Sequence, residues 1–295
     1  FPYTTLFRSL ECGGLTLIKF FRIKTMKLIT PNIWGGKIHQ PFLDFLKKYQ
    51  DVDIFCFQEV YNTNSGVKEF HGIHPNIFQD IKDALPEFDA LYAPAQEGVY
   101  DDLKVDFDIS FGLAMFVKKS ITVEKHEDIF VFRSKNAKQP GEDSAGIGRN
   151  LEHIVFNTGV APTTNDDVAS TSAVSTTYSI FNLHGLWNGK GKSDTEDRLN
   201  QSMKTKEFMK NYSTHKTILC GDFNLMPDTE SLAILETGMK NLVKEHGVTS
   251  TRSSLYPKPL KFADYILVSP DIAVKDFKVL PDEVSDHMAL YVEFE

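Results

Sequence analysis

The 295-residue sequence predicts an α/β fold in one large domain. Three observations support this class. Short apolar runs typical of buried strands alternate along the chain with stretches whose apolar residues recur at helical spacing. The residues from 26 onward are numerous enough for a single domain with a sizeable core. Polar side chains directly follow several of the strand-like runs, where the mouth of a sheet would gather them.

Residues 1–25 are expected to be a non-native leader. Residues 1–9 resemble the in-frame translation of a sequencing-library adapter, and residues 10–25 would then be read-through. A genuine short leader is the alternative, but the segment lacks the order of a signal peptide and is too short and too charged to cross a membrane. Met26 opens the first strand-like run, and Pro31 after it is either natural at the strand end or a read error.

The N-terminal half of the domain alternates strands and helices. Residues 41–49 carry four apolar side chains at helical spacing, which predicts an amphipathic helix, and residues 53–57 follow as a buried strand. A second helix over residues 77–85 would end at Pro86, which cannot continue it. Further strands, expected to form a meander, cover residues 113–117, 121–123, 129–132 and 151–156.

The C-terminal half begins with a segment of low complexity. Residues 157–177 are rich in Ser, Thr, Asn, Asp and Ala without periodicity, so we expect a mobile hairpin loop before a strand at residues 178–182. A helix after Asp194 is predicted to turn Leu199, Met203 and Phe208 inward. The last two predicted strands are a buried one at residues 217–220 and a half-buried one at residues 287–294.

Charge and cysteine content limit the function classes. The chain has 32 Lys and Arg against 40 Asp and Glu, a net charge of −8, so it has no general attraction for polyanions. This lowers the expectation of a nuclease for long DNA without removing it. Cys56 and Cys220 lie in buried runs, which favours reduced thiols and a cytoplasmic location. We expect no transmembrane segment and no obligate protein partner.

Six short motifs carry the functional signal: Asn32-Ile33-Trp34, Gln58-Glu59-Val60, Asn182-Leu183-His184, Gly221-Asp222-Phe223-Asn224, Asp264-Tyr265 and Ser285-Asp286-His287. In order and spacing they resemble the endonuclease/exonuclease/phosphatase superfamily, which includes relatives of pancreatic DNase, neutral sphingomyelinase, inositol polyphosphate 5-phosphatase and AP endonuclease. The resemblance covers nearly all of residues 26–295. It implies a DNase I-like, four-layer α/β/β/α sandwich, with two mostly antiparallel, mixed sheets stacked face to face between helices.

The resemblance also implies roles for individual residues. Asp222 would orient or deprotonate the attacking water, and Asn224 would hold a phosphate oxygen or the same water. His287 would contact the phosphate, while Asp264 would fix the tautomer of that histidine and raise its basicity. His184 would be a second phosphate contact or the acid that protonates the leaving oxygen.

Mg²⁺ or Mn²⁺ is the expected cofactor, because the candidate ligands are oxygen donors and the sequence has no Cys/His zinc spacing. Glu59, which follows a buried strand, is predicted as the main metal carboxylate with help from the amide of Asn32. Asp286 is either a second metal ligand or a structural partner of the neighbouring histidine. Arg198 and Gln201, three apart on one helix face, either support the site or form a solvated face.

These assignments predict a divalent-metal-dependent phosphohydrolase that cleaves a phosphodiester or phosphomonoester by in-line attack of an activated water. The net negative charge favours an enzyme for a small or lipid-like substrate. A DNA endonuclease or exonuclease is the alternative among enzymes. A catalytically silent module that binds a phosphate ligand is the alternative from another class. It would require the loss of a catalytic residue, and the motif residues are all present.

Substrate choice is expected to lie in loops around the site, near residues 61–75, 98–110, 135–149 and 187–194. The run Gly189-Lys190-Gly191-Lys192 in the last of these predicts a solvated turn, with a phosphate contact as the alternative. The first and middle motifs look more like the sphingomyelinase, DNase and phosphatase side of the superfamily than like its AP endonucleases.

Overall fold

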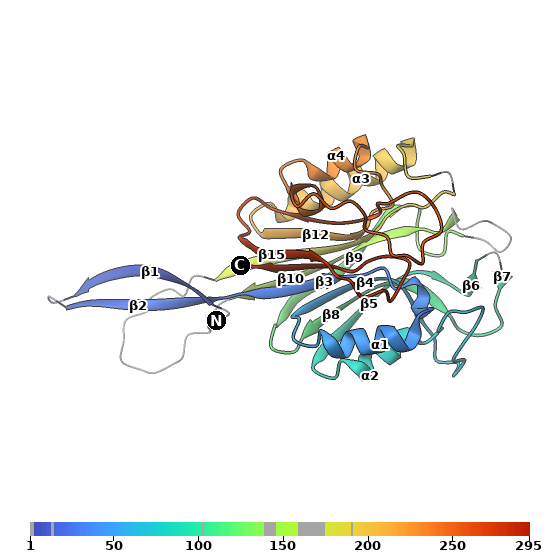
Figure 1. Cartoon of the computed structure of the whole chain (residues 1–295), viewed down its shortest axis with the longest axis horizontal. Coiled ribbons are helices and arrows are strands. Elements are labelled where there is room, and N and C mark those ends of the chain that lie inside the picture. Colours follow the sequence, from blue (N-terminus) through green and yellow to red (C-terminus); the bar gives the residue numbers. More distant parts are fainter. Residues whose placement is uncertain (1–2, 13–14, 102, 139–145, 159–174, 190) are drawn as a thin grey trace.

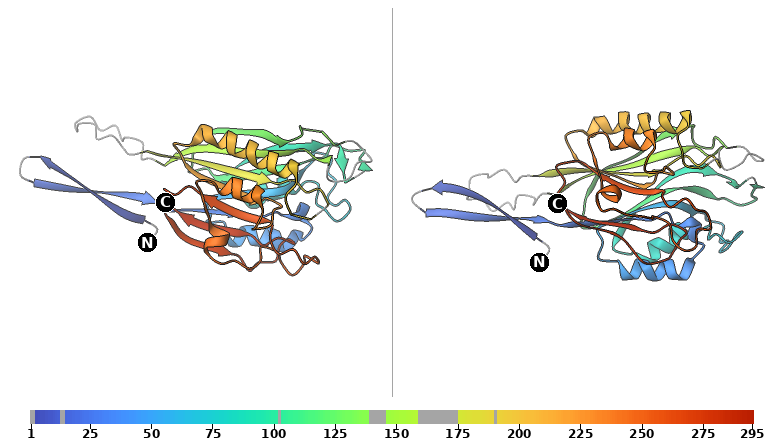
Figure 2. Two further views of the ribbon diagram at one scale, coloured as in Figure 1. Left: turned by 90° about the horizontal axis from the view of Figure 1, so that it is seen from above. Right: turned by 45° about the horizontal axis from the view of Figure 1, so that its top comes forward.

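The computed structural model describes residues 3–12, 15–101, 103–138, 146–158, 175–189 and 191–295. Two six-stranded sheets stack face to face, and helices cover the outer face of each (Figure 1). The two further views in Figure 2 show the same four layers. The predicted α/β/β/α sandwich is therefore confirmed.

The first sheet has the strand order β15-β16-β3-β4-β8-β5. Strands β3 and β4 are parallel, and the other neighbours are antiparallel. The outer face is covered by α1 (His39–Lys48) and α2 (Ile77–Ala84), whose apolar residues, such as Phe42 and Ile81, pack onto the sheet. The strands are β3 (Met26–Thr30), β4 (Ile54–Asn62), β5 (Phe88–Glu97), β8 (Ser110–Lys118), β15 (Val274–Val279) and β16 (Leu290–Phe294).

The second sheet has the order β13-β14-β12-β11-β10-β9. Strands β11 and β12 are parallel and the other pairs are antiparallel. Its strands are β9 (Val123–Phe132), β10 (Arg149–Thr158), β11 (Thr176–His184), β12 (Lys216–Asp222), β13 (Lys240–Asn241) and β14 (Asp264–Val268). Its helices are α3 (Glu196–Met209), the 3-10 turn η3 (Lys210–Tyr212), α4 (Glu230–Glu236) and α5 (Leu242–Glu245).

The apolar core lies mainly between the two sheets. Leu28, Ile54 and Met115 of the first sheet belong to the same buried cluster as Ile154 and Ile180 of the second. A second cluster fills the space between the first sheet and its helices. Burial of apolar surface on both faces of a sheet is the main force that holds such a sandwich together.

Shorter elements complete the chain. Strands β1 (Tyr3–Cys12) and β2 (Leu15–Lys24) pair in an antiparallel hairpin that projects from one end of the sandwich (Figure 1). The interpretation of this segment as a leader stays a prediction. A 3-10 turn η1 (Trp34–Gly36) follows β3, and β6 (Val99–Tyr100) pairs with β7 (Leu103–Lys104). No helix among the described residues combines the length and apolar character that a membrane crossing requires.

Several predicted elements of the N-terminal half differ from the structure. Strand β5 was not predicted, and its Pro94 is tolerated because β5 is an edge strand with an irregular register beside that residue. The strand predicted at residues 121–123 is wrong except for Val123, which begins β9. β9 runs on through the predicted strand at residues 129–132, and its exposed polar middle lies at a sheet edge. The predicted meander is also wrong in part, because residues 113–117 lie in β8 of the opposite sheet.

The C-terminal half holds three further differences. Strands β10 and β11 extend into the predicted loop at residues 157–177, and residues 159–174 of that loop lie outside the described residues. Met203 of α3 points outward and is 50% exposed, because the buried face of this helix is largely polar. The terminal strand β16 is buried on both faces, not on one, because helices cover the far side of its sheet.

His153 makes the stability of the fold depend on pH. It is fully buried on β10, where it stacks on Phe181 at a centroid distance of 4.2 Å. Burial lowers its pKa to about 4, although Glu127 partly opposes this. The unfolded chain therefore binds the proton first, and we expect the free energy of unfolding to fall by about 3 kcal/mol from this group between about pH 6.5 and pH 4.

Urea unfolding of wild type and His153→Phe at about pH 7 and about pH 4.5 checks this expectation. The variant keeps an aromatic ring in the same packing but does not titrate, so its stability should fall less on acidification. His246→Phe, at an exposed histidine, is the control and should behave like wild type. The same loss of stability in wild type and His153→Phe would contradict the assignment.

Candidate active site

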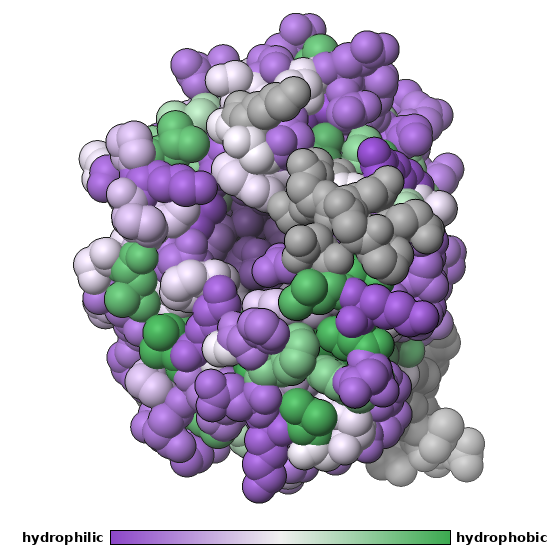
Figure 3. Space-filling model, turned by 90° about the vertical axis from the view of Figure 1, so that its right-hand side faces the viewer, coloured by the Kyte–Doolittle hydropathy of each residue, from purple (hydrophilic) through white to green (hydrophobic). Residues whose placement is uncertain are grey.

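Polar ends of strands from both sheets meet at the end of the sandwich opposite the β1–β2 hairpin. This end is hollowed, and its surface there is mainly hydrophilic (Figure 3). A cavity of about 310 Å³ opens here. Its lining includes most of the predicted site residues, together with Trp34, Tyr61, Phe111, Arg149, Trp187, Arg252 and Tyr256.

Sheet register brings three of the predicted residues side by side. In the parallel β11–β12 pair, His184 lies opposite Asp222, and in the antiparallel β12–β14 pair, Asp222 lies opposite Asp264. Glu59 arrives from β4 of the other sheet. It sits in an irregularity between Phe57 and Val60 and has a left-handed backbone with φ of 58°. Such a bulge re-aims a side chain, which here turns the Glu59 carboxylate toward the second sheet.

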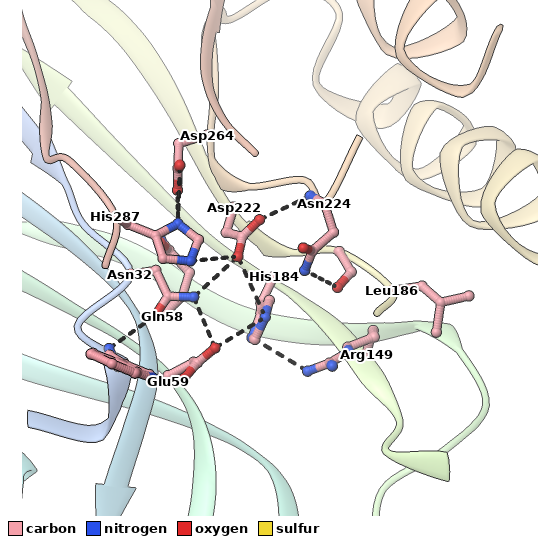
Figure 4. Close-up of polar contacts among 12 residues, drawn as sticks. Asn32, Gln58, Glu59, Arg149, His184, Leu186, Asp222, Asn224, Asp264 and His287 are labelled. Atoms are coloured by element: carbon pink, nitrogen blue, oxygen red, sulfur yellow. Dashed lines mark hydrogen bonds and ion pairs between the residues drawn. The ribbon is translucent and has the colours of Figure 1, made fainter. Parts of the chain in front are cut away.

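The side chains converge on one carboxylate oxygen, Oδ2 of Asp222 (Figure 4). Asn32 Nδ2 lies 3.1 Å from this oxygen and 3.0 Å from Glu59 Oε1, so it bridges the two acids. His287 Nε2 lies 3.6 Å from Asp222 Oδ2. His184 Nε2 lies 3.8 Å from both Asp222 Oδ2 and Glu59 Oε1.

His287 and Asp264 form a buried acid–histidine pair. Nδ1 of His287 lies 2.8 Å from Asp264 Oδ1 and donates to it, which leaves Nε2 facing the cavity. Thr251 Oγ1 donates to the other Asp264 oxygen at 2.9 Å. Burial alone would lower the pKa of His287, but the charges of Asp264 and Asp222 outweigh it and raise that pKa.

The two carboxylates of the site differ in acidity. Burial would raise the pKa of Asp222, but the nearby His287 and Lys192 hold it well below its usual range. The pKa of Glu59 is raised by burial, with the hydrogen bond from Asn32 opposing it. Asp222 is thus the more strongly held anion of the pair.

His184 is held by Arg149, which sequence reasoning missed. Arg149 is buried, and its Nη1 lies 3.3 Å from His184 Nδ1. Because a guanidinium only donates, His184 accepts at Nδ1 and carries its proton on Nε2, toward the two acids. Burial and the Arg149 charge lower the pKa of His184 well below its usual range. Arg149 ends one of the loops predicted to lie around the site and stands two residues before a predicted strand, and these positions were its only sequence signals.

Asn224 and Asp286 also line the cavity. Asn224 has a left-handed backbone with φ of 53°, its N–H donates to Asp222 Oδ1 at 2.9 Å, and its Nδ2 donates to the Gly185 carbonyl at 3.2 Å. Asp286 pairs with Arg252 at 2.9 Å, and its other oxygen lies 3.9 Å from His287 Nε2.

Arg198 and Gln201 are buried, so the solvated-face alternative is wrong for them. Arg198 donates to the carbonyls of Ser193 and Gly191 at 2.6 Å each, and Gln201 Oε1 accepts from the Leu186 N–H at 3.0 Å. Neither side chain lines the cavity, so both shape the loop beside it.

The solvated turn predicted for the Gly/Lys run is wrong for Lys192, which is only 1% exposed. Its Nζ donates to the Phe262 carbonyl at 2.9 Å, and burial lowers its pKa to about 8. Lys190 lies outside the described residues. The buried Lys192 instead adds positive charge beside Asp222.

The donor chemistry fits a hard divalent cation. Glu59, Asp222 and Asp286 bring carboxylates to one cavity, and Asp222, Asp264 and His287 offer ligand atoms within 4.8 Å of one another. Oxygen-rich sets of this kind are typical of Mg²⁺ and Mn²⁺ sites. Asn32 Oδ1 accepts from the Trp34 N–H at 3.0 Å, so as it lies Asn32 turns its amide nitrogen, not its oxygen, to the acids.

The sequence model of the Endonuclease/Exonuclease/phosphatase family matches residues 32–287. The chain belongs to this family. The match runs from Asn32 to His287 and so includes every predicted site residue. The endonucleases, exonucleases and phosphatases for which the family is named are hydrolases that act on phosphoester bonds. The predicted resemblance is confirmed.

Solved structures of the DNase I-like fold superpose on this chain. The mannosyl-6-phosphatase Bt3783 of Bacteroides thetaiotaomicron VPI-5482 is 20% identical, with a TM-score of 0.62 over 92% of this chain and 99% of that one. The human nocturnin catalytic domain with bound sulfate is 16% identical, with a TM-score of 0.58 over 92% and 93%. Humanized D. rerio TDP2 is 14% identical, with a TM-score of 0.55 over 92% and 99%. No curated protein sequence matches the chain significantly.

Proposed function

We propose that this chain is a divalent-metal-dependent phosphoester hydrolase that uses in-line attack of water on a small phosphate ester. The observation that carries the proposal is the convergence of Asn32, His184 and His287 on Asp222 Oδ2, with Glu59 facing them from the other sheet. Two acids, two imidazoles and one amide around one point suit a phosphate and its nucleophile.

Asp222 orients the attacking water. Its depressed pKa makes it a weak base at neutral pH, so it acts mainly by accepting a hydrogen bond. Asn224, held by Gly185, adds a polar group on the same side of the cavity. A divalent cation bound by Glu59 and neighbouring carboxylates would lower the pKa of the water and offset charge on the phosphate oxygens.

Two imidazole N–H groups contact the phosphate. The charges of Asp264 and Asp222 raise the pKa of His287 and so favour its charged form, which presents Nε2–H to the cavity. His184 is kept neutral by burial and by Arg149 and presents a neutral Nε2–H. Of the two roles open to His184, phosphate contact therefore fits better than proton transfer to the leaving oxygen, since a neutral imidazole with a low pKa is a poor acid.

The cavity favours a small substrate. A volume of about 310 Å³ accommodates a small phosphate ester, and the net charge of −8 gives no general attraction for long DNA. The similarity to a mannosyl-6-phosphatase is compatible with a phosphomonoester. The motif residues are complete, which weakens the alternative of a catalytically silent binding module.

The test is hydrolysis by purified protein with Mg²⁺, Mn²⁺ or EDTA. The substrates are small phosphomonoesters such as sugar phosphates, bis-p-nitrophenyl phosphate, sphingomyelin, inositol phosphates, and plain and abasic duplex DNA. We expect turnover of a small ester that stops in EDTA. Preferred cleavage of DNA would support the nuclease alternative, and no turnover by folded, metal-binding protein would overturn the proposal.

Arg149→Met should lower kcat/KM by about 10- to 100-fold, because His184 loses the donor that fixes its tautomer and the cavity loses a charge. Arg149→Lys keeps the charge without the planar donor geometry, so its kcat/KM should lie between those of the wild type and Arg149→Met. Steady-state kinetics on the best small substrate measures the effect. Arg133→Met, outside the cavity lining, is the control. Unchanged kcat/KM in Arg149→Met would refute the assigned role.

A further inference from the structure

Two buried amide side chains join the sheets beneath the cavity. Gln58 of β4 reaches from the first sheet, and its Nε2 donates to Asn182 Oδ1 of β11 in the second sheet at 2.7 Å. Asn182 Nδ2 donates back to the Phe57 carbonyl of the first sheet at 3.1 Å. Both residues are fully buried. We call this pair the amide clasp.

The clasp is held from several sides. Gln58 Nε2 also lies 3.1 Å from Thr30 Oγ1 and 2.9 Å from the Cys56 carbonyl. Asn182 Nδ2 also lies 3.1 Å from Glu152 Oε2. Gln58 Oε1 has no hydrogen-bond partner among the described residues. A buried, unpaired oxygen destabilises a fold, so stability alone explains Gln58 poorly.

Gly221 provides the space for the clasp. Its backbone φ is +127°, and a Cβ there would lie 2.2 Å from the Leu183 carbonyl oxygen and 3.1 Å from Gln58 Nε2. A glycine at this position therefore allows Gln58 to lie against the backbone of β12. The clasp thus connects β4 with both parallel strands of the second sheet.

The clasp lies next in sequence to groups of the proposed active site on both sheets. Gln58 directly precedes Glu59, Gly221 directly precedes Asp222, and Asn182 stands two residues before His184. Glu59 lies on the first sheet, whereas Asp222 and His184 lie on the second. Because the backbone of Glu59 is left-handed, the direction of its side chain depends on how the neighbouring residues are held. A shift between the sheets here would change the distances among all three groups.

We propose that Gln58 and Asn182 are positioning residues that set the distance between the Glu59 carboxylate and the Asp222–His184 pair. This inference rests on the proposed function for its effect on turnover. The clasp touches no substrate itself. It acts by fixing the relative position of two strands whose ends carry the reacting groups, and small displacements of such groups have large effects on rate.

The test compares Gln58→Met, Asn182→Leu and the double variant with Ser179→Ala. Ser179 is also fully buried on β11 but bonds to His215 at 2.8 Å, away from the clasp. For each protein, kcat, KM, the Mn²⁺ Kd by calorimetry and the urea midpoint are measured. We expect kcat to fall about 10- to 100-fold with KM changed by less than about threefold, and Mn²⁺ affinity to fall about tenfold.

The single and double variants should lose similar amounts of kcat, because the two amides act as one unit. Ser179→Ala should lose stability but keep kcat and Mn²⁺ affinity. A loss of stability without change in kcat or Mn²⁺ affinity in the clasp variants would overturn the proposal. If the wild type hydrolyses no substrate, the proposed function fails, but the Mn²⁺ affinities still decide the positioning role.

Thr30→Val is the replacement test if the clasp variants do not fold. It removes one partner of Gln58 Nε2 and leaves both amides in place. We then expect kcat to fall by about two- to fivefold with KM unchanged. Unchanged kcat and unchanged Mn²⁺ affinity in a folded Thr30→Val protein would count against the clasp.

Discussion

Asp222→Asn is expected to lower kcat/KM for phosphoester hydrolysis by about 1,000-fold or more. Asp222 is the point on which Asn32, His184 and His287 converge, and its charge is stabilised by His287 and Lys192. The amide removes the anion that orients the water and pairs with both imidazoles. Single-turnover and steady-state kinetics on the best small ester measure the loss.

Asp228→Asn is the matched control for this variant. Asp228 is exposed and lies outside the cavity lining, so its amide should leave kcat/KM unchanged. The urea midpoint of both proteins shows whether each is folded. Wild-type activity in a folded Asp222→Asn protein would contradict the proposal that the Asp222 carboxylate orients the attacking water.

Asp264→Asn should lower kcat by about 100- to 10,000-fold with a smaller change in KM. Asp264 accepts from His287 Nδ1 and raises the pKa of that imidazole. An amide at this position removes the negative charge and offers an N–H group, which favours the wrong tautomer of His287. The charged N–H that faces the phosphate is then lost, and the loss is felt most in the transition state.

Thr251→Val separates the two functions of Asp264. It removes the donor to Asp264 Oδ2 and leaves the contact to His287 in place. Valine also removes the acceptor of the Ala263 and Asp264 N–H groups, so we expect a loss of stability. The loss of kcat should stay below about tenfold, because the charge of Asp264 beside His287 is kept. NMR titration of the His287 ring should show a lowered pKa in Asp264→Asn and little change in Thr251→Val. An unshifted pKa in Asp264→Asn would argue against the pair.

Local sequence patterns predicted those site residues whose position is set by the end of a single strand. Glu59 follows a buried apolar run, and Asp222 closes another, so their placement at the mouth of a sheet could be expected. The side chains of α3 show the limit of such signals. Helical spacing predicted Met203 inside, yet Arg198 and Gln201 are buried and Met203 is exposed.

The reason is that burial on α3 is decided by what the helix covers. Arg198 is buried because it bonds to the carbonyls of Gly191 and Ser193, and Gln201 because it accepts from the Leu186 N–H. Lys192 is buried for a similar reason, since its Nζ meets the Phe262 carbonyl. Lys192 and Phe262 are 70 residues apart, so the sequence around Lys192 could not predict this contact.

The sequence by itself determined the superfamily, the α/β sandwich and the residue types of the site, because each motif is a local pattern of strand and polar end. The tertiary structure alone decided how these groups meet. Asn32 and Asp222 are 190 residues apart in sequence and 3.1 Å apart in space. Strand pairing and the packing of the two sheets create that proximity, along with the contacts of Arg149 and the amide clasp. They depend on long-range register, which no single stretch of the chain encodes.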